Sequence, residues 1–286
     1  MSASPAPVAQ LLTAAATQLS AISDSPRLDA EILLAHVLKR SRTWLFTWPD
    51  KVPNAEEVSA FHGLIQRRAV GEPVAYLTGE REFWSLPLAV SPATLIPRPD
   101  TETLVAVALE HFGHQAIRAL DLGTGTGAIA LALAHERPQW ELVAVDREAA
   151  AVALALCNRD RLQLTNVEIL QSDWFATVSG HFDLIVSNPP YIDPADPHLQ
   201  QGDVRHEPAS ALVAKQGGLA DLAHIIATGV NYLASEGLLI VEHGADQGEA
   251  VRKLFSKGGY QKVASIRDLA GLERVTLGYA PPSPPN

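Results

Sequence analysis

Residues 117–130 read IRALDLGTGTGAIA and decide the fold of the chain. An apolar run typical of a buried strand ends in Asp121, passes through three glycines and enters an apolar helical segment at 128–137. Glycine lets the backbone turn tightly and lets a ligand approach without meeting a side chain. The stretch therefore predicts a strand, a ligand-binding glycine loop and a helix.

The same alternation continues along the chain beyond this stretch. Near-continuous apolar strands that alternate with helices indicate an α/β fold with a doubly wound, mostly parallel, seven-stranded sheet. The predicted strands are 117–123, 140–146, 167–173, 182–188, 237–244, 260–268 and 272–280, and the predicted helices between them are 128–137, 147–160, 219–237 and 250–259.

The segment before the sheet has a different character. Ser25 as N-cap and Pro26 at the first helical position begin a helix at 25–40, in which Leu28, Ile32 and Ala35 follow at helical spacing. A second helical segment ends at Gly71. The sequence therefore predicts four parts: a helical domain at 1–72, a β-hairpin linker at 73–98, the α/β domain at 99–280 and a disordered tail at 281–286.

The composition limits the class of protein. Of the 286 residues 47% are apolar and 19% are charged, which is typical of a folded globular chain. The single cysteine, Cys157, excludes an internal disulfide, and the ten histidines show no zinc-ligand spacing, so we expect no metal. The N-terminus shows no targeting signal and no apolar run is long enough to span a membrane. We therefore expect a cytoplasmic protein.

The charge balance bears on possible partners. The net charge is −10, whereas proteins that track a nucleic-acid backbone usually present a basic surface. The balance therefore argues against a direct nucleic-acid partner.

The glycine loop and the next strand predict a nucleoside site. Asp146 ends the second strand, 23 residues after Gly123, where an acid accepts hydrogen bonds from ribose hydroxyls. Gly123, Gly125 and Ala128 also fit the dinucleotide pattern of dehydrogenases. Asp121 argues against that alternative, because a carboxylate is a poor neighbour for a pyrophosphate and acceptable beside a cationic ligand.

The third strand ends in Asp173 and Trp174, an acid and an aromatic that suit the amino group and the face of an adenine. The fourth ends at Asn188, so four strand ends point at one crevice, where open α/β sheets bind ligands. This signature resembles class I S-adenosylmethionine-dependent methyltransferases. It predicts cofactor contacts from Asp121, Gly123, Thr124, Gly125, Thr126, Gly127, Asp146, Asp173, Trp174 and Asn188.

The turn that follows the fourth strand reads NPPY, residues 188–191. Methylation of a planar NH2 group builds positive charge on nitrogen, so a suitable site offers fixed hydrogen-bond acceptors and few donors. The Asn188 side-chain oxygen and the Pro189 carbonyl are such acceptors, and neither Pro189 nor Pro190 has an N–H. Tyr191 is expected to cover one face of the planar group. These four residues are the predicted catalytic set.

The whole chain resembles the HemK/PrmC family, which methylates the glutamine of the Gly-Gly-Gln motif in class I peptide-chain release factors. The resemblance implies S-adenosylmethionine as cofactor, a class I release factor as partner and a role for the N-terminal helices in holding it. The stretches that carry it are PVAYLTG at 73–79, IPRPDTE at 96–102, DLGTGTGAIA at 121–130, NPPYI at 188–192, VRHEPASAL at 204–212 and EHG at 242–244.

Some details stay open at this stage. His206 stands where the family often has an aromatic residue, and we interpret it as a loop residue rather than a base. We expect Arg205 and Glu207 to hold the long loop after the NPPY turn together, and Arg98 with Glu102 to brace the cofactor pocket. The alternative in both cases is a salt bridge with a structural role alone. The alternatives to glutamine methylation are an amino-methyltransferase acting on adenine or cytosine of nucleic acid, a non-enzymatic S-adenosylmethionine-binding regulator and a dehydrogenase.

Overall fold

The computed structural model describes residues 6–282, which form two compact units. The first contains the chain up to Glu80 together with Pro197–His206, and the second contains Arg81–Asp196 and the chain from Glu207 on. Residues 283–286 of the predicted tail lie outside the described residues. Within residues 6–282, no helix has the length and apolar character needed to cross a membrane.

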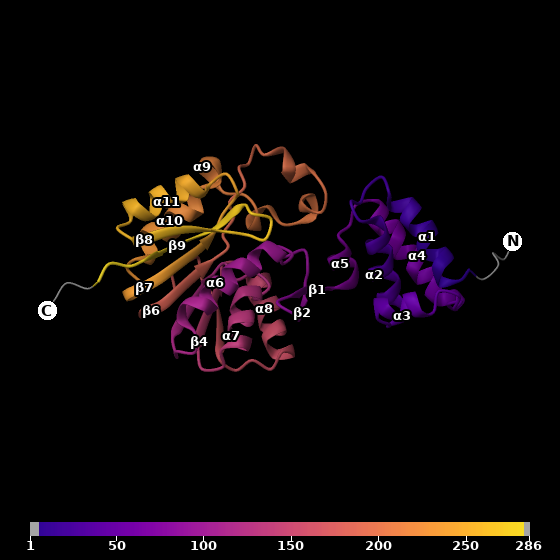
Figure 1. Cartoon of the computed structure of the whole chain (residues 1–286), viewed down its shortest axis with the longest axis horizontal. Helices are drawn as coiled ribbons and strands as arrows, with labels where there is room; N and C mark the ends of the chain where they lie inside the picture. Colours follow the sequence, from indigo (N-terminus) through magenta and orange to yellow (C-terminus); the bar gives the residue numbers. More distant parts are fainter. Residues whose placement is uncertain (1–5, 283–286) are drawn as a thin grey trace. The chain divides into compact units, whose positions relative to one another are not determined.

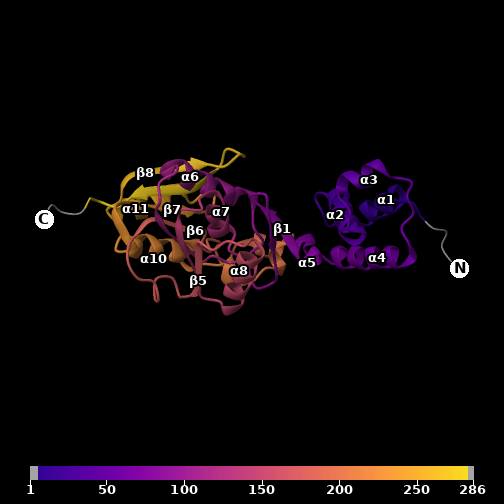
Figure 2. The same cartoon turned by 90° about the horizontal axis from the view of Figure 1, so that it is seen from below.

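The first unit is helical, as the sequence predicts. Its helices are α1 (Val8–Leu19), α2 (Pro26–Leu38), α3 (Arg42–Thr47), α4 (Ala55–Ala69) and α5 (Val74–Thr78). Helices α1, α2 and α4 pack on one another around Leu12, Leu33 and Phe61 (Figure 2). Pro26 occupies the first turn of α2 as predicted, but Leu28 is 37% exposed, because Leu33 and Leu34 rather than Leu28 face the core.

A buried arginine, Arg68, holds the inserted segment Pro197–His206 in this unit. The Arg68 guanidinium donates to Asp29 Oδ2 at 2.8 Å and to Asp203 Oδ1 at 2.7 Å. Arg205 donates to the carbonyl oxygen of Val70 at 3.3 Å, and the chain at Gly71 lies so close that a Cβ there would collide with the guanidinium. Arg205 thus holds the segment to the end of α4, and its expected joint role with Glu207 stays a prediction.

The hairpin predicted between the helical region and the sheet is present. Strands β1 (Glu80–Phe83) and β2 (Leu86–Ala89) are joined by Trp84 and Ser85, both with positive φ, as two-residue hairpin turns require. The stretch VAYLT in front of it forms α5 rather than a strand, with Pro73 as the N-cap residue and Gly79 in the left-handed conformation at the C-cap of the short helix.

The second unit contains the predicted seven-stranded sheet. Its strands are β3 (Arg118–Leu122), β4 (Glu141–Asp146), β5 (Val167–Gln171), β6 (Phe182–Ser187), β7 (Leu233–Glu242), β8 (Gln261–Arg267) and β9 (Glu273–Tyr279). The strand order is β5-β4-β3-β6-β7-β9-β8, and β9 is antiparallel to both of its neighbours, whereas the other pairs are parallel. The prediction of a mostly parallel, doubly wound sheet is confirmed.

Helices cover both faces of this sheet (Figure 1). One apolar cluster joins the sheet to α6 (Glu102–Phe112), α7 (Ala128–Glu136) and α8 (Ala149–Arg161). A second joins the opposite face to α10 (Ala220–Gly229) and α11 (Gly248–Lys257). Short helical turns complete the described chain: η1 (Pro99–Thr101), η2 (Pro197–Gln200), η3 (Val204–His206), η4 (Ala209–Ala211) and α9 (Lys215–Gly218).

Two helix boundaries differ from the sequence-based prediction. The helix predicted at 219–237 ends at Gly229, and β7 already begins at Leu233, which pairs with Phe182 of β6. This pairing is a tertiary contact, so local helical spacing does not reveal it. Helix α6 has no predicted counterpart.

Candidate active site

The four predicted strand ends lie on one edge of the sheet. Strands β5, β4, β3 and β6 are neighbours and run parallel, with Leu122 beside Val145 and Ser187. The residues that follow these strands therefore meet at the carboxyl edge, where open α/β sheets bind ligands.

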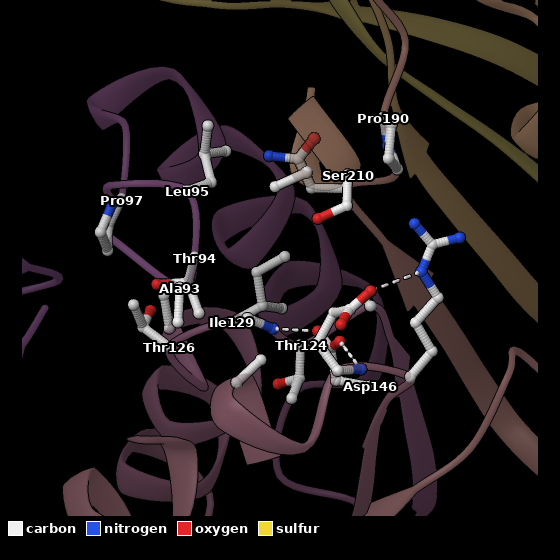
Figure 3. A pocket seen from close by; sticks show the side chains of 18 of the residues that line it. Ala93, Thr94, Leu95, Pro97, Thr124, Thr126, Ile129, Asp146, Pro190 and Ser210 are labelled. Carbon is white, nitrogen blue, oxygen red and sulfur yellow. Dashed lines mark hydrogen bonds and ion pairs between the residues drawn. The ribbon is translucent and has the colours of Figure 1, made fainter. Parts of the chain in front are cut away.

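A pocket of about 920 Å³, open solvent at its mouth included, occupies this edge (Figure 3). Pro190 and Ser210 lie across it from Ala93 and Pro97, and Asp146 reaches it from the end of β4. Nine of the predicted site residues line it: Gly123, Thr124, Gly125, Thr126, Asp146, Asp173, Trp174, Asn188 and Pro190. Four others do not: Asp121, Gly127, Pro189 and Tyr191.

The glycine loop is held by the strand beside it. The N–H groups of Gly123 and Thr124 both donate to the carbonyl oxygen of Val145 at 2.9 Å. The N–H of Gly125 donates to Asp146 Oδ2 at 2.9 Å. Gly123, Gly125 and Gly127 all have positive φ, so the course of the loop requires glycine at these positions.

Asp146 is the acid at the pocket wall. Its Oδ1 accepts the N–H of Glu148 at 3.0 Å, so both carboxylate oxygens are oriented by backbone donors. Burial raises the pKa of Asp146, and the two backbone hydrogen bonds lower it. The arrangement fixes a carboxylate where a ligand with hydroxyl groups can donate to it.

Asp121 lies beneath the loop rather than at the pocket surface. It is fully buried, and its Oδ2 accepts the Thr124 hydroxyl at 2.7 Å and the N–H of Ala130 at 3.3 Å. Its Oδ1 forms no hydrogen bond with any residue in the range 6–282. Burial raises the pKa of Asp121 to about 7. A cationic ligand above the loop would favour the ionised form.

The end of β5 is strained around an aromatic residue. Trp174 has a φ of 48°, an uncommon conformation for a bulky side chain, and its carbonyl oxygen accepts the Ser172 hydroxyl at 2.9 Å. The indole ring lies against Gly123, and both residues line the pocket next to Asp173. Such strain persists where surrounding structure enforces it, and functional sites are common among those places.

The NPPY turn presents acceptors at the end of β6. The Asn188 amide nitrogen donates to the Thr101 hydroxyl at 3.2 Å, which leaves its side-chain oxygen for other donors. Pro189 is buried, and within residues 6–282 its carbonyl oxygen accepts no hydrogen bond. Gln247 donates to the Tyr191 carbonyl oxygen at 2.9 Å. The turn is thus fixed, while the Asn188 side-chain oxygen and the Pro189 carbonyl oxygen have no hydrogen-bond partner within residues 6–282.

Tyr191 is oriented away from the pocket lining. Its hydroxyl donates to Glu242 Oε1 at 3.2 Å, at the end of the adjacent strand β7. Burial raises the pKa of Tyr191, and the charge of Glu242 raises it further. The part played by Tyr191 in covering a substrate group remains a prediction.

The predicted site residues leave out part of the pocket lining, which comes from the linker, from loops and from the starts of α7 and α8. Arg98 lines the pocket, where it was expected as a brace. The missed residues are Phe83, Ala93, Thr94, Leu95, Pro97, Thr101, Ala128, Ile129, Arg147, Glu148, Ala151, Ser172, Ser210 and Ala211. The signals for part of this set are three stretches that carry the family resemblance: IPRPDTE at 96–102, DLGTGTGAIA at 121–130 and VRHEPASAL at 204–212.

The ion pair at this wall also differs from the prediction. Arg98 pairs with the buried carboxylate of Glu207, which in addition accepts the N–H of Ile96 at 2.9 Å. Glu102 instead accepts the N–H of Trp84 at 2.8 Å. His206 does not line the pocket and accepts a hydrogen bond from Arg205 at 3.1 Å. Over residues 6–282 no group of three or more His, Cys, Asp or Glu is arranged to hold a metal ion.

Comparison with known proteins gives the family. Residues 10–79 match the PrmC N-terminal domain, and residues 100–257 match the methyltransferase small domain. The chain is 58% identical to the release factor glutamine methyltransferase of Escherichia coli K12 over 268 residues, which cover 93% of this chain and 96% of that protein. The chain belongs to the release factor glutamine methyltransferase family. The HemK/PrmC resemblance is confirmed.

Two further matches agree with membership of the release factor glutamine methyltransferase family. The release factor glutamine methyltransferase of Pseudomonas aeruginosa is 54% identical to this chain, over 91% of this chain and 95% of its own length. The solved 16S rRNA N2 G1207 methyltransferase of T. thermophilus, in complex with AdoMet and guanosine, has a TM-score of 0.52 at 17% identity and covers 70% of this chain and 49% of that one. The second match supports the methyltransferase fold.

Proposed function

We propose that this enzyme transfers the methyl group of S-adenosylmethionine to the side-chain amide nitrogen, N5, of the glutamine in the Gly-Gly-Gln motif of class I release factors, and so modulates translation termination. The observation that carries the proposal is the orientation of Asn188. Thr101 binds its amide nitrogen, which leaves the amide oxygen at a pocket wall as an acceptor.

The pocket fits S-adenosylmethionine. Asp146 would accept hydrogen bonds from the ribose hydroxyls, and Asp173 and Trp174 would hold the adenine. The glycine loop would contact the remaining part of the cofactor. The unpaired Oδ1 of buried Asp121 adds negative potential below the loop, which suits a cation.

When bound, S-adenosylmethionine supplies an electrophilic methyl group on a sulfonium sulfur. The chain's own task is to hold a weakly nucleophilic amide. The Asn188 side-chain oxygen and the Pro189 carbonyl oxygen would each accept one N–H of the glutamine NH2 group, which fixes the nitrogen and stabilises its growing positive charge. Pro189 and Pro190 lack N–H groups, so no backbone donor competes there.

The helical unit supports a protein partner. It exposes large apolar side chains in one short stretch: Phe46 is 57% exposed, Trp48 49% and Val52 50%. Exposed apolar patches mark interaction sites. We propose that this unit helps to hold the release factor. Replacing Phe46 and Trp48 by Ser should then raise KM for the release factor while cofactor affinity stays unchanged.

The proposed function is tested by following labelled methyl groups. The enzyme is incubated with labelled S-adenosylmethionine and a class I release factor, either wild type or with the Gly-Gly-Gln glutamine replaced by alanine. Label is expected on the wild-type factor alone. Equal labelling of both factors, or labelling of DNA with neither factor labelled, would contradict glutamine methylation, and the DNA result would favour the amino-methyltransferase alternative.

A further inference from the structure

Asn158 is a buried polar residue among alanines on one face of α8. The buried residues of this helix are Ala151, Ala155 and Asn158, which are four and three residues apart and so share a face. Asn158 is 1% exposed. Burying an amide without hydrogen bonds is costly, so the partners of this side chain indicate its role.

The Asn158 amide joins the linker hairpin to the glycine loop. Its Oδ1 accepts the N–H of Ala89 at 2.7 Å, and its nitrogen donates to the carbonyl oxygen of the same residue at 3.0 Å. A neighbouring strand binds a strand residue with the same pair of bonds. The Asn158 nitrogen also donates to the carbonyl oxygen of Thr126 at 2.9 Å. Both N–H groups of the amide are therefore used.

The two segments that Asn158 joins form facing parts of the pocket wall. Thr126 belongs to the glycine loop and lines the pocket, and Ala89 ends β2, shortly before the lining residues Ala93 and Thr94 (Figure 3). The segments approach closely, since a Cβ atom at Gly125 would lie 3.9 Å from Thr94 Cβ. A shift of Ala89 relative to Thr126 would therefore change the width of the pocket.

We propose that Asn158 is a positioning residue for the cofactor: its amide ties the linker strand β2 to the glycine loop and so fixes the distance between two walls of the pocket. This role rests on the proposed S-adenosylmethionine site. Asn158 does not line the pocket itself, so it acts through the backbone of Ala89 and Thr126. Without the amide, three buried backbone bonds are lost, and the two walls can separate.

The test compares Asn158→Ala and Asn158→Ser with a matched control, Asn166→Ala. The side chain of Asn166 also binds main-chain carbonyl groups, and it does not line the cofactor pocket. Its nitrogen lies 3.2–3.3 Å from the carbonyl oxygens of Ala134, Arg137 and Trp140. The control therefore removes an amide of the same kind at a different place in the fold.

The first readout is the calorimetric Kd for S-adenosylhomocysteine. We expect it to rise about tenfold in Asn158→Ala, the size expected when buried backbone groups lose their partner. Asn158→Ser should bind with intermediate affinity, because its hydroxyl can still donate to one carbonyl oxygen. Asn166→Ala should keep the wild-type Kd even if its melting temperature falls. In the Asn158 variants KM for S-adenosylmethionine should rise, while kcat at saturating cofactor stays close to the wild-type value.

The second readout is amide hydrogen exchange in the ligand-free protein. Exchange in residues 89–96 and 123–127 should be faster in Asn158→Ala than in the wild type, because the tie between these segments is lost. Asn166→Ala should leave exchange in both segments unchanged. This readout reports the separation of the two walls without any bound ligand.

Each outcome decides a separate claim. A wild-type Kd and unchanged exchange in the Asn158 variants would overturn the role of Asn158 while leaving the proposed function intact. An equal rise of the Kd in Asn166→Ala would also overturn it, since a general loss of stability would then explain the effect. If Asn158→Ala does not fold, Asn158→Ser decides by the same criteria. If the wild type does not bind S-adenosylhomocysteine, the proposed function fails, and the role of Asn158 fails with it.

Discussion

The indole ring of Trp174 lies against Gly123, and a Cβ atom at position 123 would come within 3.3 Å of its Cζ3. Gly123→Ala should therefore move the ring from the pocket wall. We expect cofactor affinity to fall about tenfold or more and stability to fall by about 1–2 kcal/mol. Isothermal calorimetry and urea unfolding measure the two effects.

Gly79 provides the matched control for this substitution. It has the same φ of 74°, but a Cβ there would meet nothing within 4 Å. Gly79→Ala should therefore lower the free energy of unfolding by about 1 kcal/mol, through backbone strain alone, and leave cofactor affinity unchanged. Equal loss of cofactor affinity in both variants would show that the contact with Trp174 has no part in it.

Asp146→Ala tests the predicted ribose acceptor. Hydrogen bonds to a charged group contribute about 1.5–3 kcal/mol, so the Kd for S-adenosylhomocysteine should rise about 10- to 100-fold. Asp160→Ala, on the exposed side of α8, should leave the Kd unchanged. Unchanged calorimetric affinity in Asp146→Ala would exclude Asp146 as a ligand contact.

Glu207→Ala tests whether the Glu207 carboxylate holds the linker, through Ile96 and Arg98, to the segment after the NPPY turn. The substitution leaves the N–H of Ile96 and the half-buried Arg98 without their partner. We expect the free energy of unfolding to fall by about 2–3 kcal/mol. Lys253→Ala, which breaks an exposed pair with Glu249, should cost less than about 1 kcal/mol. If the two variants lose similar amounts of unfolding free energy, Glu207 does not hold the two segments together.

The buried Asp121 makes stability depend on pH. Its folded-state pKa of about 7 is above the usual 3.8, so the folded state binds the proton more tightly than the unfolded state and loses stability as the pH rises from about 4 to about 7. Between pH 5 and 8 the ligand-free wild type should lose about 3 kcal/mol relative to Asp121→Asn. Urea unfolding at both pH values measures the difference, and parallel pH profiles would contradict the assignment.

The α/β architecture was predictable because its central strands are continuous apolar runs that end in polar residues. Asp146 and Asn188 lie within one residue of the ends of β4 and β6. The strand ends alone therefore predicted that these residues lie at one pocket. The end of α10 was not predictable in this way. Leu233 belongs to β7 because of its pairing with Phe182, and no local pattern encodes that contact.

The pocket wall from the linker and loops was less accessible to sequence reasoning. Thr94 and Leu95 lie in an irregular segment and Ser210 in the three-residue helical turn η4, where no periodicity indicates which side chains face a ligand. The pairing of Arg98 with Glu207 joins residues more than a hundred positions apart, so proximity along the chain favoured Glu102 instead. Charge pairs in loops depend on the fold as a whole.

Asn188→Ala tests the central claim most directly, that the NPPY turn works through its acceptor oxygens. The measurement is the single-turnover rate of release factor methylation at saturating cofactor, together with calorimetric cofactor affinity. We predict that the rate falls at least about 100-fold while the cofactor Kd changes less than about threefold. A retained methylation rate with intact cofactor binding would contradict the acceptor mechanism.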